Sequence, residues 1–296
     1  MSMDKIAVIG LGKVGTTFAH LLQKAGYGIV ALFDTDAAAS DRALTYVDAA
    51  VFPDPASAAS AADTVIIATN DDAIEYISRN IAAAGAITSG MKIIHTSGAG
   101  SLDLLSAARQ KGASVGCLHP IQTFSDIDGA ITNVPGSVFG IVADEDIKSW
   151  LGDMAGAMGG HPVFISDGDK PLYHAAAVFA SNYLVTLIHA AVDLYSSLGM
   201  SEDEALTAIR PLIAGTVRNI EENGPVRALT GPIARGDIGT VRRHLASLTG
   251  DASRLLPLYR LLGEMTVDLA LTGGSLTRES ARTINNILQG EKFDHE

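Results

Sequence analysis

The glycine-rich segment near the N-terminus constrains the fold of this chain most strongly. An apolar run from Lys5 leads into Gly10-Leu-Gly-Lys-Val-Gly15, and a helix-like stretch and a second apolar run follow, ending at Asp34. This order predicts a strand, a tight turn, a helix and a second strand. In such a unit the first glycine permits the turn, the second lets a diphosphate approach the backbone, and the third allows close packing of helix on strand. The first amide groups of the helix then attract phosphate.

This unit predicts a dinucleotide site. Asp34 lies 24 residues after Gly10, close to the roughly 20 expected for an acid that binds the adenosine ribose. Its charge would repel a 2′-phosphate, so we expect NAD as cofactor, while Lys13 leaves NADP possible. A tight turn without a ligand is the alternative. The predicted cofactor-binding residues are Gly10, Leu11, Gly12, Lys13, Val14, Gly15, Asp34, Asn70 and Asp71.

Composition bounds the class of protein. The chain has 296 residues, which suggests about two domains. Its net charge of −12 argues against nonspecific nucleic-acid binding, which needs a basic surface. The single cysteine, Cys117, excludes an intrachain disulfide and is expected to be a small buried side chain. We predict no metal site.

Targeting signals are not apparent. The first strand begins at Lys5, which leaves no room for a signal peptide, and no uninterrupted apolar segment is long enough to span a membrane. We therefore expect a soluble cytoplasmic protein that binds a small molecule and contacts neither membrane nor nucleic acid.

Residues 1–168 are predicted to form a Rossmann-like domain of the α/β class. Further apolar runs end near residues 70, 97, 120 and 143, and helical patterns separate them. Strands that are apolar throughout indicate a doubly wound, mostly parallel sheet covered on both faces.

Polar residues at the strand exits mark the expected site, because ligands bind at the carboxyl ends of such strands. His119 either adjoins substrate and nicotinamide or shapes the loop. Gln122 either holds a polar substrate group or satisfies the loop backbone. Ser97 is expected to contact the ligand, whereas His95, inside a strand, is expected to be structural.

Residues 169–296 are predicted to form an all-α domain. A helix runs from Pro171 to Leu198 and stops at Gly199, a length of about 40 Å. Because most of its positions are apolar, we expect it to be buried on several sides.

One side of this helix carries polar residues. Lys170, His174 and Ser181 share a narrow sector, and Asn182 and His189 lie further round the same side. Buried polar groups need partners, so they either bond within the core or face a cleft; we favour the cleft for His174 and Asn182. Lys170, at the start of the helix, is expected to be solvated.

The remaining helices are predicted from caps and periodicity. A capping box from Ser201 to Glu204 starts a helix that ends near residue 223, and Asp237 caps another. Arg235, in the loop before Asp237, either binds an anionic substrate or forms a surface salt bridge. Later helices cover roughly residues 252–272 and 277–288, and a frayed tail is expected from Gly290 onward.

Three further motifs carry a resemblance to a known family. They are His119-Pro-Ile-Gln-Thr-Phe, Tyr173-His-Ala-Ala-Ala-Val-Phe-Ala-Ser-Asn182 and Thr230-Gly-Pro-Ile-Ala-Arg-Gly-Asp237. With the glycine loop, they make the chain resemble the family that joins a Rossmann-like domain to a helical domain of unknown function. That family is similar to phosphogluconate and hydroxyisobutyrate dehydrogenases, pyrroline-carboxylate reductase and ketopantoate reductase.

The resemblance implies a nicotinamide cofactor, an active site between the domains and a homodimer joined through the helical domain. In the hydroxyacid and ketopantoate enzymes a lysine on the interdomain helix transfers the proton, with an asparagine one turn later. Here His174 follows Lys170 by one turn, and Asn182 comes later. We therefore prefer His174 to Lys170 as the acid/base residue.

The sequence thus predicts an NAD(P)-dependent oxidoreductase that transfers hydride between nicotinamide and a small C=O or C=N substrate. His174, Asn182 and His119 are the predicted catalytic residues, and Gln122, Ser97 and Arg235 are the predicted substrate-binding residues. A ketopantoate reductase or an imino-acid reductase of the pyrroline-carboxylate type is the alternative activity. A dinucleotide-binding sensor or scaffold without catalysis is the alternative class.

Overall fold

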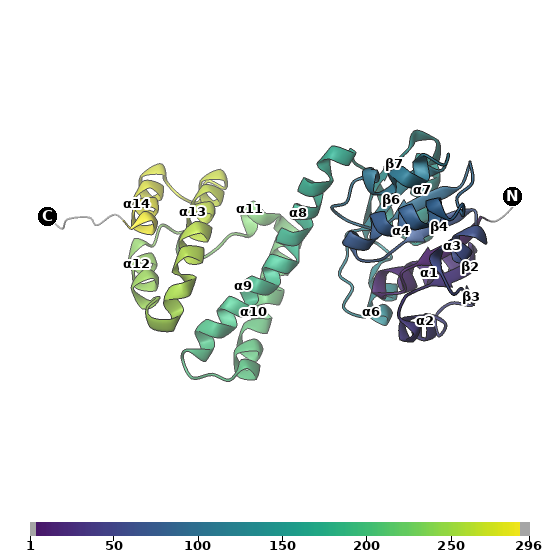
Figure 1. The fold of residues 1–296 in the computed structure, drawn as a ribbon. Coiled ribbons are helices and arrows are strands. Elements are labelled where there is room, and N and C mark those ends of the chain that lie inside the picture. The colour runs from purple at the N-terminus through teal and green to yellow at the C-terminus, as the bar shows by residue number, and fades with distance from the viewer. Residues whose placement is uncertain (1–3, 291–296) are drawn as a thin grey trace. The chain divides into compact units, whose positions relative to one another are not determined.

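The computed structural model describes residues 4–290, which form two compact units (Figure 1). The first unit extends to Asn182 and the second begins at Tyr183. The sequence predicted a domain boundary between residues 168 and 169, which is 14 residues before the boundary between these two units. The units divide later because helix α8 (Lys170–Ala180) packs against the sheet of the first unit through Lys170 and Tyr173.

The first unit is built on one eight-stranded sheet of order β3-β2-β1-β4-β5-β6-β7-β8. All neighbouring strands are parallel except β6 and β7, which are antiparallel. The order reverses at β1, which lies between β2 and β4, and such a switch point is where a doubly wound sheet binds its ligand. The strands are β1 (Lys5–Ile9), β2 (Gly28–Phe33), β3 (Ala50–Val51), β4 (Thr64–Ile67), β5 (Lys92–His95), β6 (Ser114–Pro120), β7 (Val138–Ala143) and β8 (His161–Phe164).

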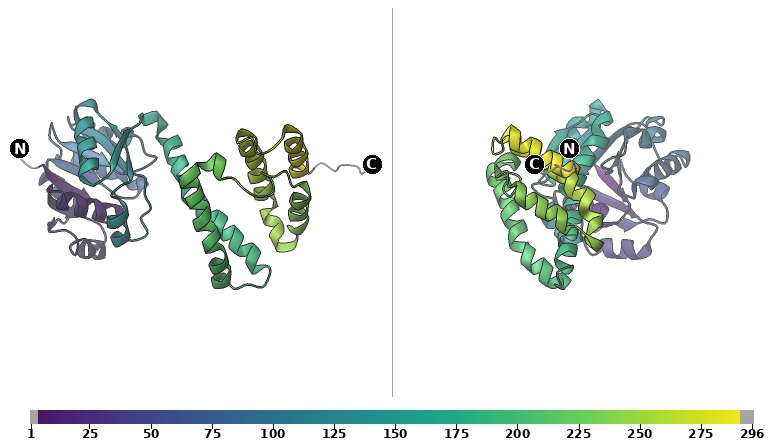
Figure 2. Two further views of the ribbon diagram at one scale, coloured as in Figure 1. Left: turned by 180° about the vertical axis from the view of Figure 1, so that it is seen from behind. Right: turned by 90° about the vertical axis from the view of Figure 1, so that its left-hand side faces the viewer.

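Helices cover both faces of this sheet, as the two views of Figure 2 show. In β1, Ile6 and Val8 join one apolar core, whereas Ala7 and Ile9 join the other. Burial of both faces explains why the strands are apolar throughout rather than alternating. One face is covered by α1 (Lys13–Lys24), α2 (Ala37–Ala43), α6 (Ile127–Asn133) and α7 (Glu145–Ala157); the other by α3 (Pro55–Ser60), α4 (Asp71–Ala83), η1 (Leu102–Leu105) and α5 (Ser106–Arg109).

The last two strands differ from the sequence expectation. The chain returns beside β6 after the short helix α6, so β7 runs antiparallel to β6. Strand β8 was not predicted; it is only four residues long, contains Pro162, and all four of its residues are exposed at the sheet edge.

The second unit is helical, as predicted. The capping box of Ser201 and Glu204 is present, and the Asp237 side chain accepts a hydrogen bond from the Thr240 amide. The tail was predicted from Gly290 onward; Gly290 caps the last helix, and residues 291–296 lie outside the described residues. The helices after η2 (Asp167–Asp169) and α8 are α9 (Asn182–Ser196), α10 (Glu202–Asn223), α11 (Pro225–Ala228), α12 (Ile238–Ser247), η3 (Gly250–Leu255), α13 (Leu256–Thr272) and α14 (Arg278–Gln289).

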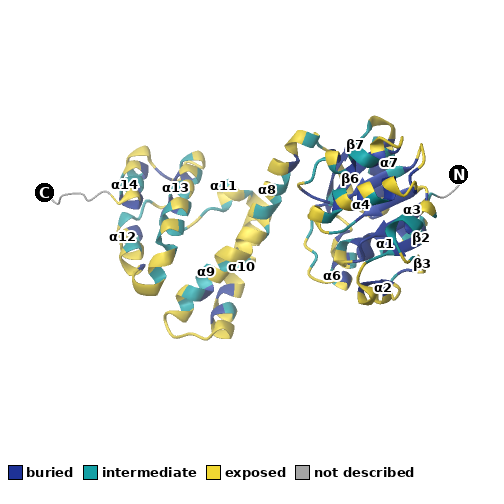
Figure 3. Ribbon diagram, viewed as in Figure 1, coloured by how far each residue is buried: buried dark blue, intermediate teal, exposed yellow. Residues whose placement is uncertain are grey.

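The long apolar helix is interrupted and exposed. It breaks at Ser181 (φ −119°, ψ −73°), so α8 and α9 replace the single predicted helix. Only 6% of its most apolar 18-residue window is buried, and much of its ribbon is coloured as exposed in Figure 3. The expectation of burial on several sides is therefore wrong. The cause is the small core beside α9, which contains only Val192, Ala205 and Ile209 as buried members.

This stretch also corrects the expectation that no segment reaches membrane-spanning length. Taken together across the break at Ser181, the helical residues Asp167–Ser196 number 30 and are long and apolar enough to cross a membrane. This criterion uses only length and composition. An apolar helix at a protein interface meets it as well as a membrane-spanning helix does.

Candidate functional site

Three glycines shape the turn between β1 and α1. Gly10 has a φ of +93°, and a Cβ there would lie 2.7 Å from the Ala68 carbonyl carbon. A Cβ on Gly15 would overlap the Gly10 carbonyl oxygen, so only glycine lets α1 pack this close to the strand. A Cβ on Gly12 would meet nothing within 4 Å. The space beside Gly12 is therefore open to a ligand.

A first cavity of about 530 Å³ adjoins this turn. It brings together four of the predicted cofactor-binding residues, Gly10, Gly12, Asp34 and Asn70. Leu11, by contrast, is buried in the core, and Lys13, Val14 and Gly15 form the start of α1. The other lining residues are Phe33, Thr35, Pro55, Ala68, Thr69, Ala73, Tyr76, Ile77 and Asn80.

The Asp34 carboxylate is held at the end of β2 by two backbone amides. Its Oδ2 accepts a hydrogen bond from the Leu11 amide at 2.6 Å, and its Oδ1 accepts one from the Asp36 amide at 2.9 Å. These bonds tie the acid to the glycine turn, although the two are 23 residues apart. The negative charge consequently lies on the wall of the first cavity.

A second cavity, of about 570 Å³, joins the exit of β6 to helix α8. It brings together His119, Gln122, His174 and Asn182. The other residues of its wall are Pro120, Ile121, Thr123, Phe124, Ser125, Ala177, Val178, Ala180 and Ser181.

His119 and His174 meet at the buried glycine that follows β5. Their rings lie edge to face, with centroids 5.7 Å apart. A Cβ on Gly98 would lie 2.8 Å from His119 Nε2 and would overlap His174 Nδ1. The lack of a side chain at Gly98 is therefore what lets two imidazoles approach the same point.

Tyr173 supports His119 and was missed by the sequence analysis. Its hydroxyl lies 3.2 Å from His119 Nδ1, and the two rings are edge to face. Burial raises the pKa of Tyr173 to about 12. Burial, followed by the charges of Lys170 and His174, lowers the pKa of His119 to about 4. Both groups are consequently neutral near pH 7. An aromatic one position before His174 was the available signal, but periodicity alone does not distinguish it from a core residue.

Lys170 is buried, so the expectation that it is solvated is wrong. It is 1% exposed, and its Nζ donates hydrogen bonds to the Ser97 carbonyl oxygen and to Cys117 Sγ, both at 2.9 Å. Cys117 is fully buried, as predicted, and burial raises the pKa of its thiol to about 11 despite the opposing effect of Lys170.

Ser97 and Asp71 bond to each other beside this lysine. Ser97 Oγ donates to Asp71 Oδ2 at 2.7 Å and accepts from the Gly100 amide at 2.8 Å. Neither residue is among those that line the two cavities. The geometry therefore favours a bracing role for both, while their predicted ligand contacts stay predictions. His95 is fully buried and its Nδ1 accepts from the Ser97 amide at 3.2 Å, in line with a structural role.

The Gln122 amide is engaged within its own loop. Its Nε2 donates to the Asn133 carbonyl oxygen and to Ser137 Oγ, both at 3.0 Å, and its Oε1 accepts from the Thr123 amide at 2.8 Å. Of the two roles that the sequence left open, this geometry favours satisfaction of the loop over substrate binding.

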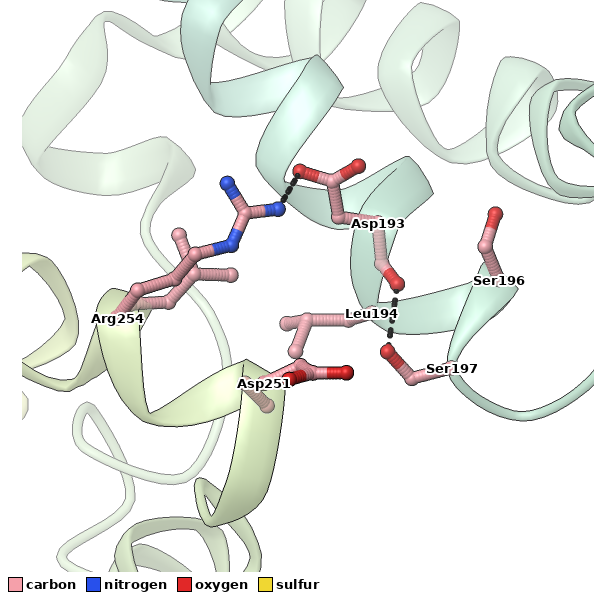
Figure 4. A pocket seen from close by; sticks show the side chains of 8 residues that line it. Asp193, Leu194, Ser196, Ser197, Asp251 and Arg254 are labelled. Atoms are coloured by element: carbon pink, nitrogen blue, oxygen red, sulfur yellow. Dashed lines mark hydrogen bonds and ion pairs between the residues drawn. The ribbon is translucent and has the colours of Figure 1, made fainter.

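Two remaining candidates belong to the second unit. The Arg235 amide donates to the Gly231 carbonyl oxygen, and His189 is exposed, with Nε2 3.7 Å from Asp193 Oδ2. A separate small pocket lies between α9 and η3, where Arg254 pairs with Asp193 at 2.6 Å (Figure 4). Because that arginine and that carboxylate neutralise each other, this pocket is a weaker candidate than the two cavities.

Two family models match separate parts of the chain. Residues 2–120 match the Rossmann-like domain, and residues 137–266 match a domain of unknown function, DUF2520. This is the domain organisation that the sequence motifs indicated. No relative was found among curated proteins.

Solved structures share the fold over most of the chain. A protein from Bacteroides fragilis, described as an NADP oxidoreductase, is 24% identical with a TM-score of 0.72, covering 89% of this chain and 98% of its own. A Thermotoga maritima protein is 23% identical with a TM-score of 0.68, covering 90% and 98%. A reductive aminase from Aspergillus terreus, in complex with NADPH and ethyl-5-oxohexanoate, is 17% identical with a TM-score of 0.60, covering 97% and 93%.

The buried histidines make the stability of the first unit dependent on pH. Burial lowers the pKa of His119 to about 4 and that of His95 to about 3, from 6.5. As the pH falls below about 6.5, the unfolded chain binds protons that the folded state does not. Stability is therefore lost between pH 6.5 and 4, by up to about tenfold in the unfolding equilibrium per pH unit for each histidine.

Fluorescence of Trp150, the only tryptophan and a residue of α7, reports unfolding of this unit. We expect the denaturant midpoint to fall steadily from pH 7 to pH 4.5. The decline should be shallower in His119→Gln and unchanged in a control, His161→Gln, because His161 is exposed. A midpoint that stays constant over this range would contradict the burial of both histidines as neutral groups.

Proposed function

Because the chain joins a Rossmann-like domain to a DUF2520 domain, we propose that it is an NAD(P)-dependent oxidoreductase acting on a small C=O or C=N substrate. The observation that supports this proposal most strongly is that His119 and His174 both approach Gly98 and both line the second cavity. The same unit contains the glycine turn with open space beside Gly12. Relatives of the same fold support the reaction class, since they are described as an NADP oxidoreductase and as a reductive aminase with NADPH.

The residues of the first cavity fit a dinucleotide. The open space at Gly12 admits a diphosphate to the backbone, and the N-terminus of α1 attracts its charge. Asp34 would bind the adenosine ribose, and its carboxylate disfavours a 2′-phosphate. We therefore propose NAD, with NADP as the competitor. When bound, the nicotinamide supplies the hydride.

His174 is the proposed acid/base residue. It lines the second cavity, and a histidine has an unperturbed pKa near neutrality, which suits proton transfer to a carbonyl or imine. Lys170 is the weaker candidate, because its ammonium group is buried and already donates to Ser97 and Cys117. His119, neutral and supported by Tyr173, would hold the polar end of the substrate, and Asn182 would orient it.

We also propose a soluble cytoplasmic homodimer formed through the helical unit. Exposed apolar side chains on α9 support this, since a monomer rarely exposes a large apolar patch. Among them Leu184 is 41% exposed and Val185 is 66% exposed. Burial in an interface would also account for the hydropathy of this stretch.

Removal of the His174 imidazole tests the catalytic proposal. In a screen of ketones, imines, oxo acids and cyclic imino acids with NADH and NADPH, His174→Ala should lower kcat about 10²- to 10⁴-fold on any compound turned over. Its thermal stability and cofactor affinity should stay near wild type. The exposed His161→Ala serves as control. Full turnover by His174→Ala would remove this role, and no oxidation of either cofactor across the screen would favour a sensor.

Cofactor binding can be measured as thermal stabilisation, because a ligand that binds only the folded state adds about 2.7 kcal/mol at 100 times its Kd. NAD⁺ should stabilise the chain more than NADP⁺, and Asp34→Ser should reduce that difference. Gly12→Ala should abolish both shifts without changing the unliganded Tm, because its Cβ meets nothing within 4 Å. A larger shift with NADP⁺ in the wild type would contradict the proposed role of Asp34.

Light scattering after size exclusion tests the dimer. The wild type should have twice the mass of one 30.7 kDa chain. The double variant Leu184→Glu and Val185→Glu should be monomeric at micromolar concentration, because it would place like charges in an apolar interface. Leu44→Glu, at an apolar residue 46% exposed in the first unit, is the matched control. A monomeric wild type, or one that sediments with membranes, would refute this proposal.

A further inference from the structure

The wall of the second cavity consists of apolar side chains, uncharged polar side chains and two histidines. Among the described residues that line it, none is a lysine, arginine, aspartate or glutamate. His119 is neutral there because burial lowers its pKa to about 4. The Lys170 ammonium group is 1% exposed and bonded to Ser97 and Cys117, so it is not available to a substrate.

The polar groups of this wall are unevenly distributed. The two imidazoles meet at Gly98, at the exits of β5 and β6. Elsewhere the side chains are either apolar, as at Ile121, Phe124 and Val178, or uncharged and polar, namely Gln122, Thr123, Ser125, Ser181 and Asn182. Gln122 bonds to Asn133, Ser137 and Thr123, and Ser125 Oγ donates to Asp126 at 2.9 Å.

This layout limits what can bind. A carboxylate moved from water into an apolar site loses hydration that only a cation or several donors can replace. A carbonyl or imine group needs only one or two hydrogen bonds, which the imidazoles can supply. We infer that the substrate is an uncharged ketone or imine with an apolar body; this inference rests on the oxidoreductase function proposed above. This class differs from ketopantoate and pyrroline carboxylate, which both carry a carboxylate.

A matched pair of ketones isolates the charge. Methyl 4-oxopentanoate and 4-oxopentanoate share the reacting carbonyl and the chain, and only the acid is ionised at pH 7. We expect kcat/KM for the ester to exceed that for the acid by at least about tenfold, a difference of 1.4 kcal/mol. In the presence of the oxidised cofactor, the ester should also raise Tm at concentrations at which the acid does not.

A cation placed in the wall should reverse this preference. Val178 lines the cavity, whereas Ala176 lies on the same helix, is exposed and is not part of the wall. Val178→Lys should shift the ester-to-acid ratio towards the acid by at least about tenfold, whereas Ala176→Lys should leave it unchanged. Thr123→Lys, at an exposed residue of the wall, provides a second variant if Val178→Lys does not fold.

Several outcomes would overturn the inference while leaving the oxidoreductase function in place. The first is that the wild type prefers the acid to the ester. The second outcome is that the ester and the acid react at equal rates, both in the wild type and in Val178→Lys. If neither NAD⁺ nor NADP⁺ raises Tm, the oxidoreductase function and this inference both fail.

Discussion

The buried ammonium group of Lys170 decides where the candidate site forms. It joins the start of α8 to the segment after β5 and to the middle of β6, through the Ser97 carbonyl oxygen and Cys117 Sγ. A charge buried this deeply is tolerated only when its hydrogen bonds are made, so the helix has little freedom to shift along the sheet. Because residues one turn later on a helix lie on the same side, this anchor directs Tyr173 and His174 towards His119.

The sheet restricts the rest of the chemistry to one edge. Both of its faces are packed with apolar side chains, so the polar groups that line the two cavities are found where the strands end. The exits of β1 and β2 supply the glycine turn and Asp34, which share one cavity. Those of β5 and β6 supply Gly98 and His119, which meet His174 of α8. Glycine has the same effect at Gly12 and at Gly98: because there is no Cβ, a ligand or an imidazole ring can approach the backbone.

The exposed helices of the chain illustrate the limit of hydropathy as a guide. An apolar stretch indicates that water is excluded in the functional state, but it does not say what excludes it. Residues Asp167–Ser196 have the composition of a core helix, yet little of their surface is covered within one chain. A partner subunit or a lipid phase satisfies the same composition, and the small core around Val192 leaves the side chains of α9 available to either.

The sequence by itself determined the features that depend on short-range geometry. These include the order of strand, glycine turn and helix, the buried strands and the capping box at Ser201. Tertiary structure decided the direction of β7, the burial of Lys170, the contact of Tyr173 with His119 and the bracing of Ser97 by Asp71. The last three join residues 26 to 73 positions apart. Periodicity places a residue on one side of its own helix or strand, whereas its partner is set by how those elements pack.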